Sequence, residues 1–130
     1  MTDDLAFEEL PPGRYKGSVE RIRYSINAAT YIVIIYQVDT PEGGVRRLVE
    51  RLPIHAPSSS TAYFQTALGK GRVAEILRTK GLSLADAQAA GGIRALPGLL
   101  EGSVICVITR NRLTAGFNCP VVDRVEAHQP

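Results

Sequence analysis

The fold is decided by three consecutive stretches: YIVIIYQVDT at residues 31–40, PEGG at residues 41–44 and VRRLVERLPI at residues 45–54. The first is apolar on both faces, so one face must be covered by the core and the other by a packed element or a partner. Proline and glycine in the second stretch supply the turn of a hairpin. In the third, leucines alternate with arginines, which predicts a core face and an outward basic face. Together they predict an antiparallel hairpin.

A further strand is expected before the hairpin, at residues 14–26. Its apolar and aromatic residues keep one parity up to Val19 and the other parity from Ile22 onward. Such a slip, near Glu20 and Arg21, is the sequence sign of a β-bulge. A long, bent first strand is what a small barrel needs if that strand is to belong to both of its sheets.

Two or three short helices are expected between the third strand and the fourth. The first is predicted to begin near Thr61 and to be interrupted at residues 69–71. The second is predicted over residues 72–80, ending at Gly81, because glycine favours a left-handed cap. Residues 83–86 resemble a capping box with aspartate in place of glutamate, which predicts another short helix.

The remaining elements complete a recognisable order. A fourth strand is predicted at residues 103–110, a turn at Asn111 and Arg112, and the last strands around residues 114–117 and 121–126. Three strands, a helical segment and two further strands form the element order of an OB barrel, in which the face of strands 2 and 3 binds oligonucleotides. The sequence therefore predicts an all-β fold with a helical insertion: an OB-fold-like five-stranded antiparallel barrel with helices between strands 3 and 4.

Length and composition predict one domain. The chain has 130 residues, of which 45% are hydrophobic and 22% charged, enough for a single core. Residues 1–12 are expected to form an acidic arm, residues 13–126 the domain and residues 127–130 a short tail. No apolar run is long enough to cross a bilayer, and the first residues lack the pattern of a secretory signal. We therefore expect a cytoplasmic protein that engages no membrane.

The formal net charge of +2 conceals an asymmetry. The first nine residues contain four acidic residues and no basic one, so the rest of the chain carries 15 basic and 9 acidic residues, about +6. Twelve of the 15 basic residues are arginine, whose planar guanidinium suits phosphate contacts and stacking on bases. This charge permits nucleic-acid binding without requiring it. The alternative is an arginine-rich surface that reflects a GC-rich genome.

Short motifs connect this order of elements with a known family. They are LPxGxY (Leu10, Pro11, Gly13, Tyr15), ERL (residues 50–52) and LxGxV (Leu100, Gly102, Val104). In these respects the chain resembles short phage- and prophage-encoded OB-fold single-stranded-DNA-binding proteins, roughly from Leu10 to Val125. The resemblance implies a place in a DNA replication or recombination module of a phage or mobile element. The chain lacks the tryptophan and the acidic tail of the better-known bacterial single-strand binders, so partner recruitment through such a tail is not expected.

Single-strand binding needs aromatic faces on which bases stack and cations that follow the phosphates. The predicted stacking residues are Tyr24, Tyr31, Tyr36 and Phe117. The predicted phosphate contacts are Arg14, Lys16, Arg21, Arg23, Arg46, Arg47, Arg51, Arg110 and Arg112. We expect binding to single-stranded DNA or RNA that is largely independent of sequence. Exposed barrel edges would also allow the protein to form homo-oligomers.

Each of these residue types has a second interpretation. Tyrosine is a good strand residue and often packs in the core or at the rim. Arg47 and Arg51 can simply keep a strand face soluble, or pair with Glu20 and Glu42. The same barrel could instead be a protein-interaction or structural assembly module, with residues 31–38 buried against a partner. A flat apolar patch on that strand would favour assembly, whereas a continuous basic groove lined by exposed tyrosines would favour nucleic acid.

Enzymatic motifs are missing from the sequence. It contains no GxSxG, no HExxH and no paired nucleophile arrangement. The LGKGR at residues 68–72 lacks the first glycine and the Ser or Thr of a Walker loop. His55 and His128 lie far apart with no ligand cluster nearby. Strands this short are not expected to enclose a small-molecule cavity. We therefore expect no catalytic residue, metal, cofactor or small-molecule substrate.

Overall fold

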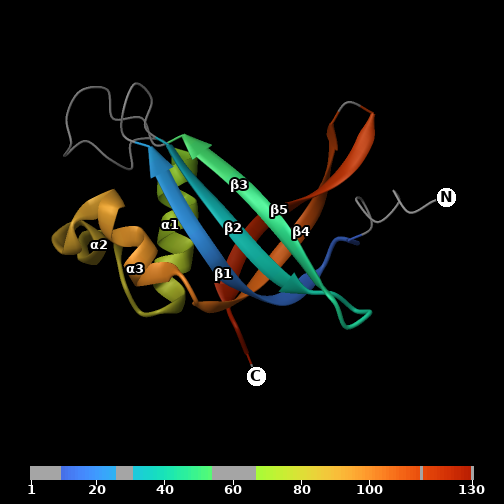
Figure 1. The fold of residues 1–130 in the computed structure, drawn as a ribbon, viewed down its shortest axis with the longest axis horizontal. Coiled ribbons are helices and arrows are strands. Elements are labelled where there is room, and N and C mark those ends of the chain that lie inside the picture. The colour runs from blue at the N-terminus through green and yellow to red at the C-terminus, as the bar shows by residue number, and fades with distance from the viewer. Residues whose placement is uncertain (1–9, 26–30, 54–66, 115, 130) are drawn as a thin grey trace.

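The computed structural model describes residues 10–25, 31–53, 67–114 and 116–129. Its elements, in chain order, are β1 (Arg14–Ser25), β2 (Tyr31–Asp39), β3 (Val45–Pro53), α1 (Ala67–Thr79), α2 (Leu84–Ala90), the 3-10 helix η2 (Gly92–Ala95), α3 (Leu96–Leu100), β4 (Val104–Thr114) and β5 (Phe117–Ala127). The strands fill one end of the molecule and the helices gather at the other (Figure 1).

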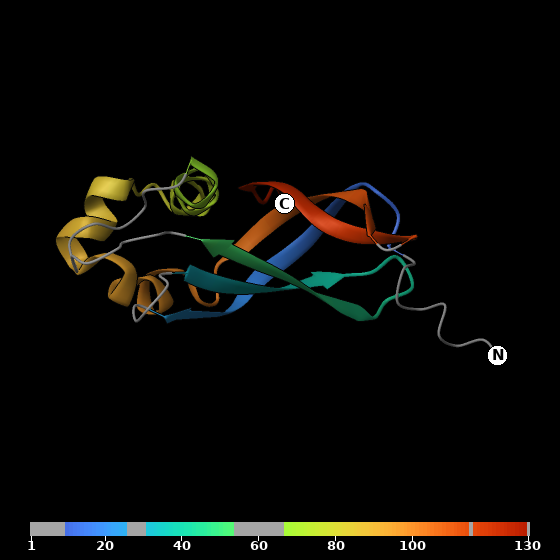
Figure 2. The ribbon, with the colours of Figure 1, turned by 90° about the horizontal axis from the view of Figure 1, so that it is seen from above.

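All five strands pair antiparallel in one sheet, in the order β3-β2-β1-β4-β5. Figures 1 and 2 show β1, β2 and β3 in one layer, with β4 and β5 crossing behind it. The sheet folds over at β1, because residues 14–18 pair with β4 while residues 17–25 pair with β2. The two edge strands, β3 and β5, therefore come near each other, although no ladder joins their described residues.

Two features allow β1 to serve both layers. A β-bulge shifts its register between Val19 and Arg21, which confirms the prediction from the change of parity. At Gly17, a Cβ atom would lie only 2.7 Å from the carbonyl oxygen of Gln37 and 2.9 Å from Cγ1 of Val38. A glycine inside a strand commonly marks such a close approach of a second backbone. The strand can therefore cross β2 closely at the point where it changes partners.

The core lies between the two layers and continues under the helices. Buried side chains from three elements meet there, among them Ile32 and Ile34 of β2, Leu48 and Leu52 of β3, and Ile76 of α1. The alternation of leucine and arginine in β3 thus places the leucines inside, as predicted. Each large aliphatic side chain buried in this way contributes roughly 1.5–3 kcal/mol to folding.

The helical region differs from the prediction at its start. α1 runs unbroken through Gly71, where the sequence predicts an interruption. A glycine inside a helix costs only about 1 kcal/mol relative to alanine. The burial of Val73, Ile76 and Leu77 on one side of α1 outweighs that cost. The predicted helix start near Thr61 falls outside the described residues.

The signals at the other helix ends are confirmed. Gly81 follows α1 with a φ of 74°, a left-handed value that favours glycine. Ser83 is the N-cap of α2: its hydroxyl accepts a hydrogen bond from the backbone N–H of Asp86 at 3.2 Å. The Asp86 carboxylate accepts one from the backbone N–H of Ser83 at 2.8 Å, which completes the capping box.

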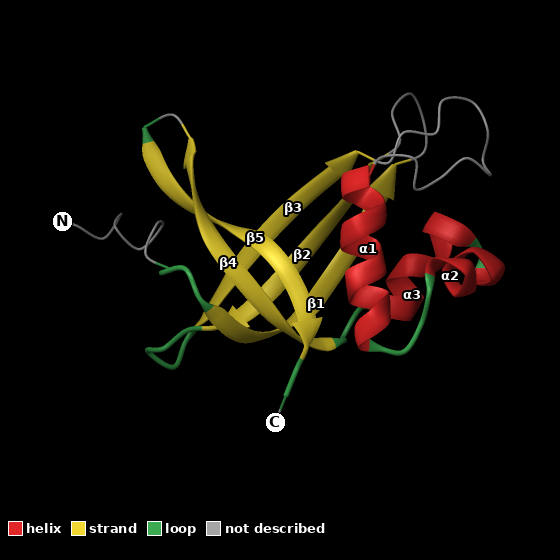
Figure 3. Ribbon diagram, turned by 180° about the vertical axis from the view of Figure 1, so that it is seen from behind, coloured by secondary structure: helices red, strands yellow, loops and turns green. Residues whose placement is uncertain are grey.

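α1 stands beside β5, on the same side of the β1–β2–β3 layer as the β4–β5 pair (Figures 2 and 3). The buried Arg72 of α1 reaches both edges of the sheet. Its Nε donates to Oε1 of Glu50 in β3 at 2.9 Å, and its Nη2 donates to the carbonyl oxygens of Val122 and Asp123 in β5 at 3.0 and 3.2 Å. One guanidinium thus links the two edge strands.

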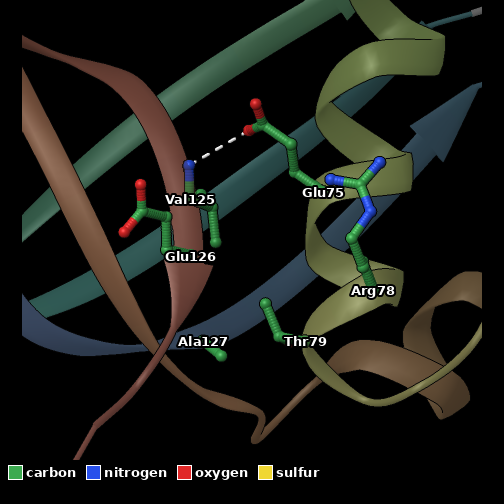
Figure 4. Close-up of a pocket in the computed structure, with 6 residues that line it drawn as sticks. All are labelled: Glu75, Arg78, Thr79, Val125, Glu126 and Ala127. Carbon is green, nitrogen blue, oxygen red and sulfur yellow. Dashed lines mark hydrogen bonds between the residues drawn. The ribbon is translucent and has the colours of Figure 1, made fainter.

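A second side chain of α1 covers the β5 edge. The Glu75 carboxylate accepts a hydrogen bond from the backbone N–H of Val125 at 3.0 Å, beside a shallow hollow of about 200 Å³ between α1 and β5 (Figure 4). Unpaired backbone groups on an edge strand invite pairing with another chain. Side chains of α1 occupy some of these groups on β5.

The architecture is therefore mostly β: five antiparallel strands in one unclosed sheet, together with three α-helices that lie between β3 and β4 in the described chain. The sequence predicts an OB-fold-like barrel; the described strands form a sheet that no ladder between β3 and β5 closes. The fourth strand is also longer than predicted. β4 continues through Asn111 and Arg112 to Thr114, and the reversal lies at Gly116, whose φ is 84°.

Candidate nucleic-acid interface

Four of the predicted arginines share the outer face of the β1–β2–β3 layer, the side turned to the viewer in Figure 1. Residues directly opposite each other on paired strands point to the same face. Arg23 of β1 is opposite Val33 of β2, which is opposite Arg51 of β3. In the next row, Arg21 is opposite Ile35, which is opposite Val49. We call this surface the arginine face, made of Arg21, Arg23, Tyr31, Val33, Ile35, Arg47, Val49 and Arg51.

The arginine face has an apolar centre between basic margins. Val49 is 63% exposed, whereas Tyr31, Val33 and Ile35 are half-buried among their neighbours. The guanidinium carbon of Arg51 lies 4.0 Å from the centroid of the Tyr31 ring, which is a cation–π contact. This stacked pair presents a flat surface of the kind on which a base can lie.

Two acidic residues lie on the same side of the sheet. Asp39 ends β2, opposite Val45, and is exposed. The carboxylate of Glu20, the extra residue of the β1 bulge, lies 2.7 Å from Nε of Arg47. This hydrogen bond holds the pKa of Glu20 below its usual value. The alternative that Arg47 pairs with Glu20 is therefore observed. Arg21 and Arg23, by contrast, form no ion pair with any residue in the described ranges.

Tyr36 cannot stack on a base, and this prediction is wrong. Its side chain is fully buried on the core face of β2, opposite to the face that holds Tyr31. The Tyr36 hydroxyl donates to Oε1 of Glu50 at 2.6 Å, and Glu50 also accepts from Arg72. Burial raises the pKa of Tyr36 well above its usual value, and the nearby Glu50 carboxylate raises it further.

Three further predicted residues lie away from the arginine face. Tyr24, 36% exposed, is opposite Ile32 and so belongs to the inner side of the sheet. Arg46 is opposite Val38 on the same inner side and is half-buried. Phe117 begins β5, but its side chain falls outside what the structure describes.

Arg14 belongs to a second surface, formed by β1, β4 and β5. Lys16 lies between this surface and the arginine face, in a hollow that it lines together with Gln37 and Asp39. Lys16 is opposite Cys106 of β4. Nη2 of Arg14 lies 2.5 Å from Oε1 of Glu126 in β5, and Nε of Arg124 lies 3.0 Å from the other oxygen of that carboxylate. Glu126 therefore compensates part of the positive charge here, and its pKa is lowered by the hydrogen bonds from Arg124 and Arg14.

The last predicted arginines meet at a cavity of about 270 Å³ between the edge of β3 and the β4–β5 pair. Arg51, Arg110 and Arg112 line it, together with the buried Arg72. Nε of Arg110 lies 3.2 Å from Oδ1 of Asp123, while Arg112 makes no ion pair within the described part of the chain. The structure thus brings these three arginines together, although Arg110 and Arg112 lie within a strand and not at its turn.

Sequence reasoning missed the Tyr36–Glu50–Arg72 network and the role of Glu75. One signal was present: alternation places Glu50 on the core face of β3, and a carboxylate there requires a partner. Nothing local identifies Arg72 as that partner, because the contact joins α1 to β3.

In the described ranges, no three His, Cys, Asp or Glu residues gather as metal ligands would. No helix in those ranges has the length and apolar character needed to cross a membrane.

In comparisons with known proteins, no protein-family model matches this chain and no curated protein matches its sequence. The function of this protein is therefore inferred from its own residues and from the resemblance described above.

Proposed function

We propose that this protein binds single-stranded nucleic acid, DNA or RNA, through the arginine face, without catalysis and largely independently of base sequence. The observation that carries the proposal is the row Arg23–Val33–Arg51, with Arg21 and Ile35 in the row beside it. It places guanidinium groups on both margins of an apolar strip, on a sheet face that no described element covers.

The physical roles follow from this arrangement. Guanidinium groups bind the phosphates, which every sequence shares. The Tyr31 ring beneath Arg51 offers a stacking surface, and each stacked base contributes about 1–3 kcal/mol whatever its identity. The apolar strip between the margins can cover bases but has no set of hydrogen-bonding groups with which to discriminate among them.

We further infer that the fold is an OB-like barrel in which α1 stands where β3 and β5 do not pair. The OB fold is a partly open five-stranded barrel that binds oligonucleotides on its strand 2–3 face and at the L45 loop. The strand 2–3 face would correspond to the arginine face, and the L45 loop to the reversal at Gly116, which follows Arg110 and Arg112 of β4. A role in phage or mobile-element replication or recombination, in the cytoplasm, rests on the family resemblance.

Fluorescence anisotropy with a labelled dT oligonucleotide of about 30 nucleotides tests the proposal, because a site of one OB fold spans roughly 4–16 nucleotides. For single strands, the slope of log K against log salt is about −0.7 per phosphate contact, so Arg23→Glu/Arg51→Glu should flatten it by about 1.4 and weaken binding at least tenfold. Arg14→Glu/Arg124→Glu makes the same charge change on the second surface and should have little effect. Equal losses in both double variants, or no binding at low salt, would contradict the proposal.

A second candidate function, assembly with another protein or a second copy, is favoured by one observation. Val45 and Val49 on the edge strand β3 are 57% and 63% exposed, and exposed apolar edges are pairing sites. Self-association through β3 without any anisotropy change on adding oligonucleotide would favour this function over nucleic-acid binding.

A further inference from the structure

We propose that Glu20 is an internal competitor for phosphate: its ion pair with Arg47 withholds that guanidinium from the nucleic acid and confines the bound backbone to the end of the arginine face that carries Arg21, Arg23 and Arg51. This inference rests on the proposed function. It names the residue that limits the affinity for nucleic acid and the part of the arginine face that the bound strand occupies.

The β-bulge of β1 is what brings Glu20 to this face. In a regular strand, neighbouring residues such as Glu20 and Arg21 point to opposite faces. The register shift leaves Glu20 without a partner in the ladder and sets Arg21 opposite Ile35 on the outer face. The Glu20 carboxylate reaches across β2 to Nε of Arg47 on β3, at 2.7 Å. An acid therefore lies among the cations of the outer face.

The position of this pair divides the arginine face. Arg47 is opposite Gln37, two rows from the row that joins Val33 to Arg51. Four residues of extended strand separate Arg47 from Arg51, about 13 Å. Arg23 and Arg51 at one end form no ion pair within the described ranges, whereas Arg47 at the other end is already paired. Arg21 lies in the row between them, and its charge also helps to lower the pKa of Glu20. Phosphates are therefore favoured at the end with Arg51.

A single substitution should be enough to shift the competition between Glu20 and phosphate for Arg47. Both members of the pair are largely exposed, with side-chain exposures of 65% for Arg47 and 33% for Glu20, and exposed pairs are weak. Replacing Glu20 by glutamine removes the competing charge and leaves a side chain of similar size. The freed Arg47 then becomes available for one additional phosphate contact.

The test is a double-mutant cycle of Glu20→Gln, Arg47→Ala and the combined variant, with anisotropy read on dT and rU oligonucleotides at two salt concentrations. Glu20→Gln should tighten binding about threefold to tenfold and steepen the salt slope by about 0.7, one single-strand contact. Arg47→Ala alone should weaken binding, because it leaves the Glu20 carboxylate unpaired on the same face, where it repels phosphate. The combined variant should bind like the wild type, because the guanidinium released by the first change is then missing.

Glu126→Gln is the matched control, since it removes the same charge from an ion-paired glutamate on the second surface. An equal gain in this variant, or a combined variant that binds as tightly as Glu20→Gln alone, would show a general charge effect and overturn the inference. A gain with only one of the two polymers would also overturn it, because both carry the phosphates. If the wild type binds and Glu20→Gln does not strengthen binding, this inference alone fails. If the wild type does not bind at low salt, the proposed function fails as well.

Discussion

Among individual residues, Gly17 has less room for a side chain than the other described glycines. We expect Gly17→Ala to lower the free energy of unfolding by about 1–3 kcal/mol, because the added methyl group would push the backbone of β2 away from β1. Urea denaturation measures this directly. Gly71→Ala is the control: Gly71 is exposed within α1 with no neighbour near its missing Cβ, so the change should stabilise by up to about 1 kcal/mol. Unchanged stability of Gly17→Ala would contradict the close crossing of β1 and β2.

Because the pKa of Tyr36 is raised, the free energy of unfolding should depend on pH in the alkaline range. Because burial and Glu50 raise its pKa in the folded state above the unfolded value of about 10, the folded protein holds the phenolic proton more tightly. This contribution is complete below pH 10 and is lost as the pH rises through the folded-state pKa.

Tyr36→Phe should therefore cost about 1 kcal/mol at neutral pH, since Glu50 loses one hydrogen-bond donor. Above pH 10 the difference from the wild type should shrink. Urea unfolding of both proteins across this pH range is the measurement. A difference that stays constant with pH would show that folding does not raise the pKa of Tyr36.

At the scale of elements, α1 links the two edges of an open sheet. Arg72 is buried with Glu50 and donates to carbonyl oxygens of β5. Removing one member of a buried ion pair costs about 3–5 kcal/mol, so Arg72→Met should destabilise by that amount. The exposed pair of Arg47 provides the comparison, and Arg47→Met should cost at most about 1 kcal/mol.

Hydrogen exchange adds a local readout to the Arg72 comparison. In the wild type the Val125 amide should exchange slowly although it lies on an edge strand, because the Glu75 carboxylate accepts its hydrogen bond. Arg72→Met should speed that exchange by loosening α1 from β5. Equal destabilisation by Arg72→Met and Arg47→Met, with Val125 still protected, would contradict the linking role of α1.

Elements encoded by local chemistry could be predicted from the sequence. The bulge of β1 follows from a change of parity, and the cap of α2 follows from the spacing of Ser83 and Asp86. The predictions at residues 69–71 and at Asn111 and Arg112 were wrong because distant packing decides them. Burial of α1 outweighs the cost of its glycines, and pairing with β5 extends β4 past the expected turn.

In the candidate site, too, local alternation could be predicted from the sequence, whereas contacts between distant elements could not. Alternation along β3 was enough to predict that Arg47 and Arg51 point outward together. It could not orient β2, whose residues are apolar on both faces, so the sequence did not show that Tyr31 points outward while Tyr36 is buried. From the sequence alone, Arg47 could either pair with Glu20 or contact phosphate. The bulge of β1, which brings Glu20 to the outer face, is what allows the ion pair to form.

At the scale of the whole molecule, two surfaces carry exposed arginines. They differ in how far carboxylates compensate the positive charge of these arginines. On the outer side of β1, β2 and β3, four arginines lie with the carboxylates of Glu20 and Asp39, and one ion pair, between Glu20 and Arg47, forms there among the described residues. On the surface of β1, β4 and β5, the carboxylates of Glu126 and Asp123 pair with Arg14, Arg124 and Arg110. A polyanion should therefore prefer the arginine face, and this preference is the central claim.

The most direct test is a titration of the ¹⁵N-labelled protein with a dT oligonucleotide, followed by amide chemical shifts in two-dimensional NMR. We expect the shift changes to gather at residues 21–23, 31–35 and 49–51, and to weaken when salt is added. Residues 14 and 124–126, on the second surface, should remain unperturbed. Changes that gather on the second surface instead, or no changes at low salt, would contradict the central claim.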